Sequence, residues 1–139
     1  MPETLDLALA RKALAAQPFS ALLGARLTAF GDGEATLELD IREELLQQYG
    51  SVHGGVLAYA ADNALAFAAA TVAGTRLITT GLTIDYLRRA TGEVLRAHAR
   101  VVRAGRTQAV SRCDLMTLDA GGTETLCAVA QGTVAVSRS

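Results

Sequence analysis

The chain has few of the residues from which most metal, redox and covalent sites are built. Its 139 residues include only two cysteines and two histidines. Cys113 and Cys127 are spaced for neither a zinc site nor a redox pair, so we expect packed, reduced thiols. Two histidines are too few to support a metal site, and no GxSxG motif marks a serine nucleophile. The sequence therefore predicts neither metal nor triad chemistry, and no bound cofactor.

A surplus of charge of either sign is also missing. The net charge of −1 and the pI near 6.1 create no field that would attract nucleic acid or an anionic membrane. The longest basic run is Arg88-Arg89. Residues 1–6 are acidic overall and contain no apolar signal stretch. We therefore expect a cytoplasmic protein that binds neither nucleic acid nor a membrane.

What the chain does contain is one long apolar segment, from Gly54 to Ala73, without a proline. Its composition is apolar nearly all round, which predicts a helix inside the protein. Asp62 is its only charged residue, and no side chain three or four positions away can compensate that charge. A membrane span is disfavoured because the segment is short and alanine-rich, and Asp62 alone would cost about 2.5–3.5 kcal/mol at the bilayer centre. We therefore expect either that a group outside this helix compensates the charge of Asp62 or that the carboxylate has a chemical function.

The glycine pair Gly54-Gly55 stands where this helix begins. The first backbone N–H groups of a helix have no intrahelical partner, and glycine lets a ligand carbonyl approach them closely. Gly54 and Asp62 are eight residues apart, about 12 Å along a straight helix, so one small reacting group cannot touch both. If both act on the same carbonyl, one must come from another copy of the chain. A shared role thus predicts a symmetric dimer with two composite sites.

The rest of the chain has the pattern of an antiparallel sheet. Leu37, Leu39 and Ile41 alternate with polar residues, as in a half-buried strand. Short turns containing glycine separate the other predicted strands, at residues 77–89, 93–103, 106–118 and 123–136, and a first strand is expected at about 25–30. We predict a single α+β domain over residues 1–139, with a helical lead-in over 1–24 (helices at 5–16 and 19–23) and the long helix on the concave face of the sheet. The uncovered face of the sheet suggests association.

Three segments, His53-Gly54-Gly55, Asp62-Asn63-Ala64 and Leu82–Ala90, together resemble the hotdog-fold acyl-CoA thioesterases of the phenylacetate-degradation (PaaI-like) type. The resemblance covers residues 20 to 136 or so and implies a hotdog fold, an antiparallel sheet of five to six strands wrapped around one long central helix. It also implies assembly as a homodimer and then a homotetramer. In that family the acidic helix residue is the nucleophile or the general base that directs water, which falls on Asp62. The amide that polarises the thioester carbonyl falls on Gly54.

The resemblance implies supporting residues as well. Gln47, with Gln48 beside it, matches an assisting amide, and Thr79, with Thr80 as its neighbour, matches a hydroxyl that helps to hold the water. The leaving group would be coenzyme A, whose phosphates need cations, and arginines at strand ends and turns can pair with phosphate. The candidate substrate-binding residues are His53, Gly55, Tyr59, Arg88, Arg89, Arg103 and Arg106.

These residues predict hydrolysis of an aryl- or medium-chain acyl-CoA to the free acid and coenzyme A. A thioester carbonyl is already activated, so one carboxylate and one oriented amide can suffice. A hotdog hydratase or dehydratase usually pairs an acidic residue with a histidine. Here His98 alternates with the inward-facing residues of its strand and so faces away from the core, and His53 precedes Asp62 on the same helix. The sequence therefore does not supply a histidine to pair with Asp62. A non-enzymatic module that binds acyl-CoA is the second alternative, and loss of turnover on replacing Asp62 would distinguish the two.

Overall fold

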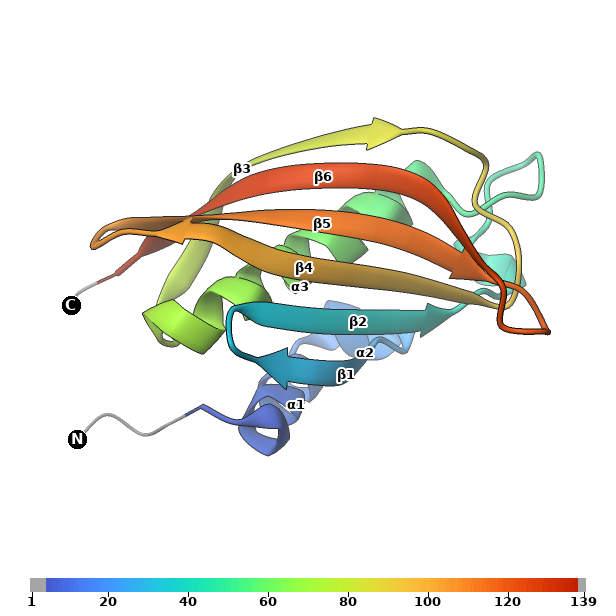
Figure 1. The fold of residues 1–139 in the computed structure, drawn as a ribbon. Coiled ribbons are helices and arrows are strands. Elements are labelled where there is room, and N and C mark those ends of the chain that lie inside the picture. The colour runs from blue at the N-terminus through green and yellow to red at the C-terminus, as the bar shows by residue number, and fades with distance from the viewer. Residues whose placement is uncertain (1–4, 138–139) are drawn as a thin grey trace.

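Within residues 5–137, which this computed structural model describes, six strands form one antiparallel sheet that curves around a single long helix (Figure 1). The strands lie in the order β1-β2-β4-β5-β6-β3, so β1 and β3 are the two edges of the sheet. In chain order the elements are α1 (Leu7–Ala15), α2 (Pro18–Leu23), β1 (Arg26–Gly31), β2 (Glu34–Asp40), the short 3-10 helix η1 (Glu43–Leu45), α3 (Gly54–Ala73), β3 (Leu77–Tyr86), β4 (Val94–Ala104), β5 (Gln108–Leu118) and β6 (Glu124–Val136).

Helix α3 has the bounds that the sequence predicts, and it forms the centre of the core. Alanine and leucine favour a helix, and α3 ends just before Gly74, whose φ of 86° is unfavourable for other residues. The face toward the sheet is fully buried and contains Leu57, Ala61 and Leu65. The helix is long and apolar enough to cross a membrane, but here it is the core helix of the domain.

The sheet separates an apolar inner face from a polar outer face. On β2, Leu37 and Leu39 are completely buried, whereas Glu34 and Glu38 point outward, as the alternating pattern predicts. Ile41 lies one residue beyond the end of β2. Irregularities in register, such as the one between Thr79 and Gly81, add the local bends that let a sheet curve around a helix.

The predicted N-terminal helices are confirmed, with slightly different ends. The side chain of Asp6 caps α1 by accepting the N–H of Leu9 at 2.9 Å, and Ala10 and Leu14 bury the inner face of α1. Helix α2 begins at Pro18 and ends at Leu23, and Gly24 after it is in the left-handed conformation. Residues 1–4 of the predicted lead-in lie outside the described residues.

Both cysteines are packed thiols, as expected. Cys113 on β5 and Cys127 on β6 are buried and unbonded to each other. Burial raises the pKa of the Cys113 thiol to about 12 and also raises that of Cys127, so neither is a thiolate near neutral pH.

The architecture is the hotdog fold, which confirms the predicted α+β class and a six-stranded sheet around one central helix. One predicted strand is too long. Strand β3 ends at Tyr86 rather than at Arg89, because the amides of Leu87 and Arg88 both turn to the carbonyl of Cys127. Residues 87–90 therefore form a connection, and this places Arg88 and Arg89 outside the sheet.

The contact between sheet and helix is tightest at Gly132 on β6. A Cβ atom there would lie 2.9 Å from the Gly81 carbonyl oxygen and 3.0 Å from a methyl group of Leu65 on α3. We expect Gly132→Ala to lower the free energy of unfolding by about 1–3 kcal/mol, because the backbone of β3 and the Leu65 side chain of α3 must both shift. Gly81→Ala is the matched control, since a Cβ at Gly81 meets nothing within 4 Å. Urea denaturation of both variants measures the difference, and equal stabilities would contradict this packing.

Candidate functional site

A cavity of about 380 Å³ lies at the N-terminal end of α3, and we call it the Gly54 cavity. The start of α3, the loop before it and the connection after β3 form its walls. It is lined by Gln47, Ser51, Val52, Gly54, Leu57, Tyr86, Leu87, Arg88, Arg89 and Ala90.

The amide of Gly54 is the chemically distinctive group in this cavity. His53 caps the helix, because its Nδ1 accepts the N–H of Gly55 at 2.8 Å and its carbonyl accepts the N–H of Val56 at 2.9 Å. Among residues 5–137 no acceptor is bonded to the N–H of Gly54. This amide stands at the positive end of the helix dipole, so it can donate to a carbonyl oxygen that enters the cavity.

Tyr86 explains why residue 54 is a glycine. The Tyr86 hydroxyl donates to the Gly54 carbonyl at 2.8 Å, and a Cβ at residue 54 would lie 3.3 Å from that ring. Tyr86 lies inside the motif that carries the family resemblance, but no pattern in the sequence singled it out. Its role depends on where β3 ends, which only the folded structure shows.

The loop before α3 holds Gln47 and Arg89 in place. The side-chain oxygen of Gln47 accepts the N–H of Tyr49, and the guanidinium of Arg89 donates to the Tyr49 carbonyl. The amide of Val52 donates to the Ala90 carbonyl at 2.9 Å, which ties the loop to the connection after β3. Gln47 and Arg89 thus line the cavity while fixing its walls. By contrast, the side chain of Arg88 has no hydrogen bond or ion pair with any described residue.

Asp62 lies on α3 but outside the Gly54 cavity. It is half-buried, and its carboxylate makes no hydrogen bond or ion pair within residues 5–137. Its charge reaches Tyr59: burial raises the pKa of the Tyr59 hydroxyl, a hydrogen bond with Ser20 lowers it, and the negative charge of Asp62 raises it further. A half-buried carboxylate without a partner is the second unusual group on this helix.

Tyr59 faces the N-terminal helices. Its hydroxyl donates to Ser20, whose hydroxyl donates to the Gln17 side chain at 2.6 Å. The Tyr59 ring meets Phe19 edge-on, with ring centroids 5.3 Å apart. This network ties α2 to α3 next to Asp62, and it occupies the Tyr59 hydroxyl.

Within one chain, the remaining predicted residues are not brought together. Thr79 on β3 pairs with Val134 and does not line the Gly54 cavity. Arg103 and Arg106 lie at the turn from β4 to β5, whereas Arg88 precedes the start of β4. Ten residues of extended strand span about 33 Å, so the four arginines do not form one cluster in a single chain.

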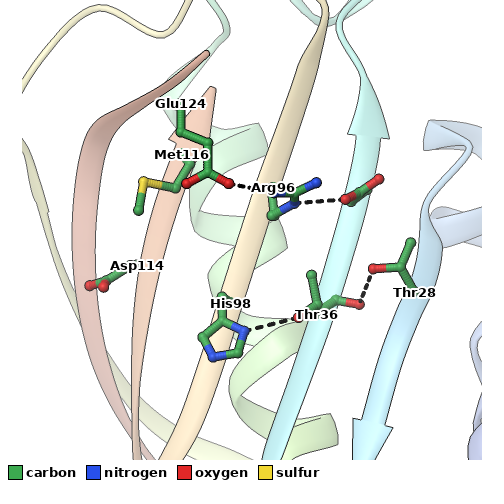
Figure 2. A pocket seen from close by; sticks show the side chains of 8 residues that line it. Thr28, Thr36, Arg96, His98, Asp114, Met116 and Glu124 are labelled. Atoms are coloured by element: carbon green, nitrogen blue, oxygen red, sulfur yellow. Dashed lines mark hydrogen bonds and ion pairs between the residues drawn. The ribbon is translucent and has the colours of Figure 1, made fainter. Parts of the chain in front are cut away.

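A cavity of about 520 Å³ lies on the outer face of the sheet, where several oppositely charged side chains pair with one another (Figure 2). Arg96 bridges Glu38 at 2.7 Å and Glu124 at 2.6 Å. His98 contacts the Thr36 hydroxyl at 2.9 Å and Glu34 at 2.8 Å, which confirms that it faces away from the core. In the described part of the chain, no three His, Cys, Asp or Glu side chains are arranged to hold a metal ion. These contacts stabilise the sheet surface and keep Arg96 and His98 bonded to neighbouring side chains.

The free edge of β3 runs beside the Gly54 cavity. Because β3 is the last strand of the sheet, one side of its backbone has no strand partner in the described chain. Apolar side chains along and beyond it are exposed, including Ile78 (68%) and Tyr86 (53%). An unpaired strand edge of this length can pair with another strand.

Comparisons with known proteins give a family and a set of similar structures. The sequence profile of the Thioesterase superfamily matches residues 49–123. A thioesterase family protein from Silicibacter pomeroyi is similar at 29% identity, over 91% of this chain and 93% of that one, with a TM-score of 0.86. Zebra fish Thioesterase Superfamily Member 2 is similar at 26% identity, over 96% and 99% of the two chains, with a TM-score of 0.82.

A mutant of the phenylacetic acid degradation protein PaaI from Thermus thermophilus is similar at 28% identity, over 87% of this chain and 100% of that one, with a TM-score of 0.77. A search of curated proteins finds no match. The profile match includes all of α3, so both unusual groups of the helix lie within it.

The cap on α3 gives a test that needs no substrate. Replacing His53 by alanine removes the side-chain acceptor of the Gly55 N–H, and we expect the free energy of unfolding to fall by about 1 kcal/mol. His53→Asn keeps a capping acceptor and should retain most of the stability. Urea denaturation of the three proteins measures this, and an alanine variant as stable as the wild type would rule out the capping role.

Proposed function

Since the chain belongs to the Thioesterase superfamily, we propose that it hydrolyses an acyl-CoA thioester to the free acid and coenzyme A. The observation that carries the proposal is that two polar groups of α3, the Gly54 N–H and the Asp62 carboxylate, have no hydrogen-bond partner among the described residues. The similarity to PaaI supports an aryl acyl group, and we propose the PaaI-like type for this chain.

In the proposed reaction the Gly54 amide donates to the thioester oxygen, where negative charge develops. Asp62 either attacks the carbonyl carbon or removes a proton from the attacking water. The carbon–sulfur bond breaks and the thiolate of coenzyme A leaves. If Asp62 is the nucleophile, water then cleaves the anhydride between the acyl group and Asp62. In both cases water supplies the second oxygen of the acid, and its proton goes to the thiolate or to solvent. Gln47 and Thr79 are proposed to orient the substrate and the water.

The distance between the two groups requires a second copy of the chain. Eight residues of helix separate Gly54 from Asp62 by about 12 Å, too far for one carbonyl group to reach both. The free edge of β3 supplies a way to join two copies, because identical strands can pair antiparallel around a twofold axis. Such pairing sets the Tyr86 end of one β3 beside the Leu77 end of the other, so Gly54 of one copy approaches Asp62 of its partner.

The same dimer supports the proposed binding of coenzyme A. Arg88 lines the Gly54 cavity without a partner among the described side chains, so its guanidinium can pair with a phosphate. Antiparallel pairing also carries the partner's β4–β5 turn, with Arg103 and Arg106, to the end of the joined sheet where Arg88 lies. We further propose that two dimers form a tetramer and that the protein is cytoplasmic.

Two other functions fit the geometry less well. A hydratase or dehydratase would need a histidine beside Asp62, but His98 is bonded to Thr36 and Glu34 on the outer face of the sheet and His53 caps α3. A non-enzymatic acyl-CoA-binding module would leave the unpaired Asp62 carboxylate without a task. Turnover distinguishes this binding module from the proposed enzyme.

Asp62→Asn tests the carboxylate. We expect the rate of free-thiol release from acyl-CoA to fall at least about 100-fold, since proton transfer or nucleophilic attack is lost. The affinity for S-(2-phenylethyl)-coenzyme A, a thioether that cannot be hydrolysed, should be retained. Asp114→Asn, at an exposed aspartate of β5 on the outer face of the sheet, is the matched control. Undiminished turnover by Asp62→Asn would contradict the proposed role, and tight binding without turnover by the wild type would favour the binding module.

Gly54→Pro tests the amide and the composite site together. Proline is tolerated at the first residue of a helix, but it removes the N–H, so we expect about a 100-fold loss of turnover. Gly54→Ala adds a similar contact with Tyr86 while keeping the N–H, and should lose less. Co-expressing Gly54→Pro with Asp62→Asn chains should restore about a quarter of the wild-type activity, because half of the dimers are mixed and each has one intact site. No restoration would mean that both residues act within one chain.

A further inference from the structure

A second concave surface on α3 lies outside the Gly54 cavity. It is a groove of about 190 Å³ over the outward face of α3, with α1 on one side and the start of β3 on the other, and we call it the helix groove. Its apolar floor and walls include Ala66, Phe67 and Ala70 of α3, Ala13 of α1 and Leu77 of β3. Phe67 is held edge-on against Phe30, with ring centroids 6.4 Å apart, so the floor is fixed.

The helix groove begins at the residue next to the proposed catalytic carboxylate. Asn63, the residue after Asp62, lines the groove. Ala66 lies four residues after Asp62, so the two side chains are neighbours on one face of the helix, one turn apart. Ala70 lies one turn further on. A carbonyl group at Asp62 can therefore continue into the groove, over Ala66 and toward Ala70.

The chemistry of the groove suits an acyl group rather than coenzyme A. Its surface is mostly apolar, and none of the described residues that line it is an arginine or a lysine, whereas Arg88 and Arg89 line the Gly54 cavity. Small-molecule sites are commonly apolar with a few polar groups that fix orientation, a role that Asn63 can take at the entrance. The volume of about 190 Å³ is close to that of an engineered apolar cavity of about 150 Å³ that binds benzene.

We infer that the helix groove holds the acyl group of the substrate and limits it to one aromatic ring or a short aliphatic chain, with Ala66 and Ala70 setting the available length. This inference rests on the proposed thioester hydrolysis and narrows its substrate class. Alanine leaves space where a larger residue would fill the groove. Helix α1 forms one wall of the groove through Ala13, so the N-terminal segment contributes to substrate specificity.

The test compares acetyl-, phenylacetyl- and decanoyl-CoA as substrates of the wild type, Ala66→Leu, Ala70→Leu and Ala15→Leu. Ala15 is an exposed alanine of α1 that does not line the groove, so it controls for leucine on a helix surface. The wild type should prefer phenylacetyl- to decanoyl-CoA by at least about tenfold in kcat/KM. Ala66→Leu should lower the ratio of kcat/KM for phenylacetyl- to acetyl-CoA by about tenfold, and Ala70→Leu by less. Ala15→Leu should leave the ratio unchanged.

Calorimetry with S-(2-phenylethyl)-coenzyme A gives a readout that is independent of turnover. Ala66→Leu should weaken its binding about tenfold relative to both the wild type and Ala15→Leu. If no thioester is turned over but this pattern of binding holds, the proposed hydrolysis fails and the groove assignment stands. Equal binding by Ala66→Leu and the wild type, or a wild-type preference for decanoyl-CoA, would overturn the assignment. If Ala66→Leu does not fold, the same comparison with Ala70→Leu decides.

Discussion

The rigid spacing along α3 is the constraint on which the rest of the account depends. An α-helix fixes the distance between its first amide and a side chain eight residues later, and no adjustment of loops can shorten it. Because α3 is buried along one side against the sheet, it cannot bend to bring Gly54 and Asp62 together. If both groups act on one thioester carbonyl, as we propose, a single chain presents two half-sites and the proposed chemistry needs a dimer.

The second consequence of the fold is that structural and chemical roles divide among neighbouring residues. His53 satisfies the Gly55 amide and leaves the Gly54 amide unpaired, and Tyr86 takes the Gly54 carbonyl. Arg89 holds the loop, whereas Arg88 beside it has no partner among the described residues. Polar groups that are already bonded set the geometry, and those left unbonded are available to a substrate. The same division separates the outer face of the sheet, where Arg96 and His98 are fully engaged, from α3.

Much of the fold could be predicted from the sequence, because its signals are local. The apolar run of α3 and the alternation on β2 indicated these elements nearly residue by residue. The end of β3 was misjudged, since it depends on the Cys127 carbonyl, a contact across the sheet that no local pattern records. The sequence also could not say that the arginines lie at opposite ends of the sheet in one chain, because nearness to a turn does not say at which end of the sheet the turn lies. The bonded state of Gln47 and Tyr59 also required the folded structure.

The most direct test of the central claim is a crystal structure of the Asp62→Asn protein with an intact acyl-CoA thioester. If two copies of the chain form one site, both copies should contact the carbonyl group of the same thioester. The account predicts that the thioester oxygen accepts the Gly54 amide of one chain, while the side chain at position 62 beside the carbonyl carbon belongs to the other. A thioester whose carbonyl contacts both residues of the same chain, or one bound on the outer face of the sheet, would contradict it.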